Sequence, residues 1–115
     1  MTENFEKAFE IANLMSTVSN QKLSLLEEFD QSILFFYNGG CFKADQPLIS
    51  FLTSLKDMNQ ESVVLLDVNK MPIRIENLEK FRQDVVSCYF EASNKYLSKY
   101  QSIQQNKNIK SILEL

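Results

Sequence analysis

The sequence contains no histidine and no tryptophan, and it has only two glycines, two prolines and two cysteines. Histidine is the commonest general base and metal ligand, so its absence excludes Ser-His-Asp and Cys-His catalytic groups. A zinc site needs four ligands, whereas Cys41 and Cys88 supply two thiolates and form no CxxC pair. We therefore expect a protein that is not an enzyme and that holds no metal and no cofactor.

Long apolar runs are also missing. No segment approaches the roughly 20 apolar residues that a membrane-spanning helix needs. The first residues, MTENFE, have neither the basic start nor the apolar stretch of a secretory signal. We therefore expect a cytoplasmic protein with no membrane partner. In that compartment Cys41 and Cys88 are expected to be reduced and buried as small apolar side chains.

Both glycines lie in one stretch, ILFFYNGGCF, at residues 33–42. A phosphate-binding loop would need more glycines, a following Lys-Ser/Thr pair and a helix start directly after the loop. Asn38-Gly39 between apolar runs instead predicts a β-hairpin, because a type I′ turn needs positive φ at both central residues. Gly40 could occupy a bulge beside that turn.

The remaining patterns predict a single α+β domain over residues 1–105. We expect helical structure at 1–31, a β-hairpin at 32–44, a helix at 45–58, a second hairpin at 62–76, a long helix at 77–105 and a C-terminal tail at 106–115. The two hairpins are expected to form one small antiparallel sheet that packs with three or four helices. Residues 20–31 fit either a second short helix or a strand. Asp67-Val68-Asn69 opens like a calcium loop, but Pro72 and Leu78 occupy its glycine and glutamate positions, which indicates an Asp-x-Asn turn.

Two helices carry conspicuous apolar patterns. In the first helix, apolar residues recur at steps of three and four: Phe5, Ala8, Phe9, Ala12 and Met15. The long helix has apolar residues over about half its circumference, wider than the ~100° that faces a single core. Its 28 residues would span about 42 Å, whereas a compact domain of this size is roughly 34 Å across, so the helix should overhang.

The distal part of the long helix therefore needs a cover, which could be the Phe-rich N-terminal helix, a second copy of the chain, or both. The residues expected to mediate self-association are Tyr89, Tyr96, Leu97, Tyr100 and Ile103. In the tail, Ile109, Ile112 and Leu113 follow a polar break at Gln104-Gln105-Asn106. We expect this apolar turn to dock on a neighbour or to fray.

Charge is unevenly distributed along the chain, whose net charge is −3. Residues 1–31 carry six acids against two lysines, whereas segment 92–113 carries no acid. A candidate charged face in that segment consists of Lys95, Lys99, Lys107 and Lys110. Nucleic-acid binding would favour a denser patch with arginine or exposed aromatics, so we do not expect so few dispersed lysines to bind nucleic acid.

Three stretches, FFYNGGCFKADQPLISFL, VVLLDVNKMPIRIENLEKF and CYFEASNKYLSKY, resemble small uncharacterised proteins of T4-like phages of marine cyanobacteria. The likeness covers about residues 31–105, and it implies a phage-encoded protein in the host cytoplasm without supplying any catalytic residue. The expected function is a non-enzymatic interaction or assembly factor that self-associates through its long C-terminal helix. The alternative is a small regulator that binds a host protein or nucleic acid through its lysine-bearing C-terminal helix.

Overall fold

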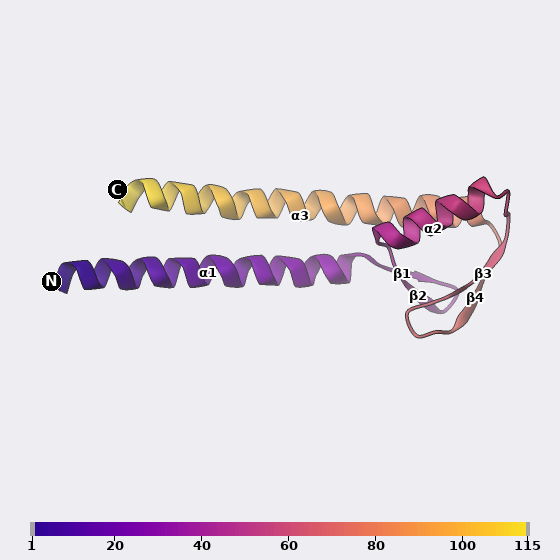
Figure 1. The fold of residues 1–115 in the computed structure, drawn as a ribbon, viewed down its shortest axis with the longest axis horizontal. Coiled ribbons are helices and arrows are strands. Elements are labelled where there is room, and N and C mark those ends of the chain that lie inside the picture. The colour runs from indigo at the N-terminus through magenta and orange to yellow at the C-terminus, as the bar shows by residue number, and fades with distance from the viewer. Residues whose placement is uncertain (1, 115) are drawn as a thin grey trace. The chain divides into compact units, whose positions relative to one another are not determined.

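A computed structural model describes the backbone of residues 2–114 and the side chains of residues 4–105. The elements in order are α1 (Thr2–Ser32), β1 (Leu34–Tyr37), β2 (Gly40–Lys43), α2 (Gln46–Asp57), β3 (Val63–Leu66), β4 (Pro72–Ile75) and α3 (Leu78–Glu114) (Figure 1). The α+β class, both hairpins and the long C-terminal helix are thus confirmed. The chain forms two compact units. The helical unit joins α1 up to Glu28 with α3 from Lys95 onward, and the mixed unit is Phe29–Asn94.

Both long helices are more continuous than expected. α1 is one helix of 31 residues, so residues 20–31 extend the first helix and form neither a strand nor a second helix. α3 has 37 residues and continues through Gln104-Gln105-Asn106, where we expected a break. Glutamine is a good helix former, so a polar sequence alone does not end a helix that lacks proline and glycine. The side chains of the tail, residues 106–115, lie outside the described residues.

The first hairpin is built as the sequence predicts, with one exception. Asn38 and Gly39 have φ angles of 47° and 80°, which confirms the turn with two positive φ values. Gly40 pairs with Tyr37 at the start of β2, so the expected bulge is wrong. Position 40 requires glycine for another reason, because a Cβ there would lie 2.7 Å from Cγ1 of Ile73 in the second hairpin.

The two hairpins form two separate two-stranded sheets, not the single sheet that we expected. Beside β2, the N–H of Cys41 donates to Oδ2 of Asp67 at 3.0 Å. The carbonyl of Cys41 accepts a hydrogen bond from the N–H of Val68 at 2.9 Å. These backbone groups of β2 are therefore satisfied by the loop after β3, which takes the place of a neighbouring strand.

The same carboxylate shapes its own loop. Oδ1 of Asp67 accepts hydrogen bonds from the N–H groups of Asn69 and Met71, both at 2.9 Å. Asp67 is only 4% exposed, and the bond from Cys41 is the largest of the contacts that lower its pKa. Because three backbone N–H groups donate to this carboxylate, the Asp-x-Asn turn is confirmed.

The core of the mixed unit gathers around Phe81, at the start of α3. Its ring meets those of Phe35, Tyr37 and Phe42 edge-on, with centroid distances of 5.6, 5.1 and 5.2 Å. The buried apolar residues of this core are Ile33, Phe42, Ala44, Leu52, Leu65, Ile73, Ile75, Leu78, Phe81, Val85 and Ala92. They come from both hairpins and from α2 and α3, so the two small sheets share one core.

Gly40→Ala should destabilise the mixed unit by about 1–3 kcal/mol, the usual cost of forcing an extra methyl group into a packed site. The new Cβ would meet the nearly buried Ile73 side chain. The control is Gly39→Asn, because asparagine tolerates positive φ and a Cβ at Gly39 meets nothing within 4 Å. Urea unfolding measures both variants, and equal losses would contradict the close approach to Ile73.

Candidate interaction surface on the helix pair

The helical unit consists of two antiparallel helical segments in contact, α1 up to Glu28 and α3 from Lys95 (Figure 1). On α1, Val18 and Leu25 are buried and Leu14 is half-buried. On α3, Tyr96, Tyr100 and Ile103 are half-buried. Within each helix these residues are three, four or seven positions apart, a spacing that is typical of the contact between two antiparallel helices. We call these two segments the helix pair.

One edge of the helix pair is closed by ion pairs. Oε1 of Glu28 lies 2.7 Å from Nζ of Lys99 and 3.3 Å from Nζ of Lys95. The hydrogen bonds to Lys99 and Lys95 lower the pKa of Glu28. Two of the four lysines of the expected charged face are therefore paired with a carboxylate of α1. The side chains of Lys107 and Lys110 lie outside the described residues.

A different contact lies on the other edge of the helix pair. Nζ of Lys22 is 4.9 Å from the ring centroid of Tyr100, and the Tyr100 ring stacks with Tyr96 at 6.0 Å. On a helix with 3.6 residues per turn, Lys22 and Glu28 point about 120° apart. The two contacts therefore mark opposite edges of the seam between α1 and α3.

The Lys22–Tyr100 edge is also the apolar one. Met15 and Leu26 lie seven residues before and four after Lys22, so they share its side of α1. Leu97 lies three residues before Tyr100 and shares its side of α3. We define the apolar face as Phe5, Ala8, Phe9, Ala12, Met15, Leu23 and Leu26 of α1 together with Leu97 of α3. Its larger side chains range from 45% exposed at Leu26 to 73% exposed at Phe5.

One of the two covers considered for α3, the N-terminal helix, does contact it, but not through the residues of its first amphipathic pattern. Those residues, Phe5 to Met15, face water. The contact with α3 uses instead a second apolar stripe of α1, which contains Val18 and Leu25. α1 therefore has two apolar faces, and only one of them is covered within the chain.

The residues expected to mediate self-association are only partly available. Tyr89 lies in the mixed unit, where its hydroxyl accepts a hydrogen bond from Nε2 of Gln46 at 2.8 Å. Tyr96, Tyr100 and Ile103 are half-buried in the helix pair, and Leu97 is 53% exposed. The larger surface lies on α1 and was not predicted. The signal that could have found it is the continuation of the Phe5–Met15 stripe to Leu23 and Leu26.

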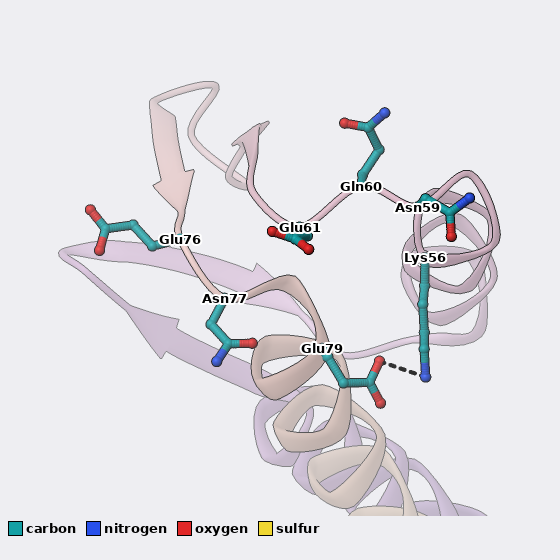
Figure 2. Close-up of a pocket in the computed structure, with 7 residues that line it drawn as sticks. All are labelled: Lys56, Asn59, Gln60, Glu61, Glu76, Asn77 and Glu79. Atoms are coloured by element: carbon teal, nitrogen blue, oxygen red, sulfur yellow. Dashed lines mark ion pairs between the residues drawn. The ribbon is translucent and has the colours of Figure 1, made fainter.

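The mixed unit contains a pocket of about 520 Å³. Its lining residues are Lys56, Asn59, Gln60, Glu61, Glu76, Asn77 and Glu79 (Figure 2). Nζ of Lys56 lies 2.9 Å from Oε2 of Glu79, and Figure 2 shows the Glu76 carboxylate directed away from this pair. The pocket is thus lined by polar side chains, and its one ion pair joins α2 to the first turn of α3.

Within residues 4–105, no three His, Cys, Asp or Glu side chains are close enough to hold a metal ion. Cys41 and Cys88 are free and half-buried. Burial raises the pKa of the Cys88 thiol, which donates to the carbonyl of Ser32 at 3.4 Å. In the part of the chain that the structure describes, none of the helices has both the length and the apolar character needed to cross a bilayer.

No protein-family model matches the chain, and no curated protein or solved structure matches it significantly. The exposed surfaces of the molecule are therefore what indicates its function. Among these, the apolar face is the feature that a single copy of the helix pair leaves uncovered.

The pocket yields a prediction about pH. Hydrogen bonds from Arg82, Lys56 and Gln83, with that of Arg82 the largest effect, lower the pKa of Glu79 to about 2 from 4.5. A carboxyl group with a lowered folded-state pKa stabilises the fold fully above its unfolded pKa, and this contribution is lost as pH falls from about 4.5 to about 2. Glu79→Gln should therefore lower Tm at pH 7. It should also reduce the fall of Tm between about pH 4.5 and pH 2, the acid limb of the Tm–pH curve.

Circular dichroism melts between pH 7 and pH 2 test this expectation. Glu76→Gln, which changes an exposed carboxyl group in the same pocket, should keep the acid limb of the wild type. Asp67 also has a lowered pKa, so part of the limb should persist in Glu79→Gln. An acid limb identical to that of the wild type in Glu79→Gln would contradict the assigned role of Glu79.

Proposed function

We propose that this chain is a non-enzymatic interaction protein that associates with further copies of itself through the helix pair. The apolar face is the observation that supports this proposal. Its six larger side chains leave on the order of 600 Å² of apolar surface in water, since a free side chain of this size exposes roughly 150–250 Å². That area is at the upper end of the largest patch on a typical monomer, about 300–600 Å².

The charges near the apolar face favour a protein partner. Between Phe5 and Leu26 the face contains no acid and no base, and Lys22 stands at its edge beside Tyr100. Nucleic acids and anionic membranes attract basic surfaces, whereas the first 31 residues carry six acids against two lysines. For a phage-encoded protein, as the resemblance implies, self-association of this kind would serve virion assembly.

The lysine-dependent alternative has less support. In binding a host protein or nucleic acid through the C-terminal helix, the partner would compete with Glu28 for Lys95 and Lys99, which are both paired with that carboxylate. A regulator of that kind would bind with a steep dependence on salt concentration. Association through the apolar face would depend on salt only weakly.

Leu23→Asp tests the proposed function. It would put an unpaired carboxylate into a buried contact, which costs several kcal/mol, so we expect the variant to be a folded monomer while the wild type is oligomeric. Ser24→Asp is the matched control, because it adds the same charge at the adjacent exposed position, about 100° around the helix. Light scattering gives the mass, and circular dichroism shows whether each variant is folded.

The Ser24→Asp variant should keep the mass of the wild type. A wild type that is monomeric at all accessible concentrations would refute the proposal. An oligomer that survives Leu23→Asp would show that association uses another surface.

A further inference from the structure

We infer that the apolar face is covered by the same face of a second copy, with the two α1 helices packed antiparallel and crossing between Met15 and Ser16. This inference rests on the proposed function and adds to it the partner, the geometry and the residue pairing. It follows from three observations on the helix pair: the apolar side chains lie along one edge only, the outer surface of α3 is polar at Gln101 and Gln104, and the side chains of α1 follow a particular order.

The first observation is that the helix pair is apolar on one side only. Glu28 and its two lysines lie on one edge, and the Lys22–Tyr100 contact lies on the other, next to Leu26 and Leu97. The apolar part of that edge belongs mainly to α1, to which α3 adds Leu97. A second copy would cover it with a surface of the same size and the same lack of charge.

The second observation is that α1 must face α1 of the other copy, not α3. On α3, the positions four and seven residues after Leu97 are Gln101 and Gln104, both exposed. Lys22 contacts Tyr100, so these glutamines lie level with the part of α1 around Leu23. Packing that part of the stripe against them would bury amide groups without partners. Among the side chains that the structure describes, at residues 4–105, only those of α1 form an apolar stripe long enough to match the stripe from Phe5 to Leu26.

The third observation concerns direction. When two helix pairs stack face to face with α1 on α1, the two-fold axis that relates the copies is perpendicular to the helix axes. That rotation reverses the direction of each helix, so the two α1 helices run antiparallel. The stripe from Phe5 to Leu26 has its midpoint between Met15 and Ser16. The facing pairs are then Phe5 with Leu26, Ala8 with Leu23, Ala12 with Ser19, and Met15 with Ser16.

This pairing suits the sizes of the side chains. Leu23 faces the small Ala8 and Met15 faces the small Ser16, so large residues enter gaps left by small ones. Ala12 and Ser19 are both small and allow the two backbones to approach closely. The area also fits, since on the order of 600 Å² per copy approaches the ~800 Å² per partner of a standard stable interface.

Disulfide crosslinking tests the pairing, because a disulfide needs Cα atoms within about 7 Å. Ala12→Cys and Ser19→Cys are made separately, each in the full chain with its native cysteines. We expect neither variant to crosslink alone under mild oxidation. Co-expression of the two should shift the 13.4-kDa band to twice that mass on a non-reducing gel. The wild type, with Cys41 and Cys88, gives the background.

The outcomes separate this inference from the proposed function. A crosslink in Ala12→Cys alone would mean that the α1 helices run parallel, which overturns the pairing and leaves self-association intact. An oligomeric wild type in which co-expressed Ala12→Cys and Ser19→Cys form no crosslink would place the interface elsewhere and also overturn the pairing. A monomeric wild type by light scattering would overturn the pairing and the proposed function together.

Discussion

The carboxylate of Asp67 is the contact on which the mixed unit depends. Isolated two-stranded hairpins are marginally stable at best, and this unit contains two of them without a shared ladder. Asp67 accepts the N–H of Cys41 from the first hairpin and two N–H groups from its own loop, and so it holds the hairpins together. With the hairpins joined, side chains from both can pack around Phe81. A hydrogen-bonded buried charge here does the work that strand pairing does in a larger sheet.

The helical unit obeys a different constraint, since α1 has more apolar surface than one neighbour can cover. The stripe with Val18 and Leu25 packs within the chain, while Phe5, Phe9 and Leu23 remain in water. The polar contacts at the seam lie on either side of the covered stripe. Glu28 holds Lys95 and Lys99 on one edge, and Lys22 lies over Tyr100 on the other, so the rotation of each helix about its axis is fixed.

Local features of the fold were predictable from the sequence, whereas long-range ones were not. The Asn38-Gly39 turn and the cap of α2, where Asp45 accepts from the N–H of Leu48, depend on a few adjacent residues. The choice between one sheet and two depends on the bond between Cys41 and Asp67, which are 26 residues apart. The α1 pattern showed that apolar faces exist, but only the partners on α3 determine which one is buried. For that reason the sequence pointed to Leu97 and missed Leu23 and Leu26.

The uncovered face of α1 also has a consequence for how the protein would respond to its own abundance. If the helix pair gains much of its stability from a second copy, the folded fraction of that pair rises with protein concentration by mass action. Early in synthesis, when copies are few, the helix pair would remain open to proteases and to other apolar surfaces. Once copies accumulate, pairing would protect it, so the chain would act as a sensor of how much of itself has been made.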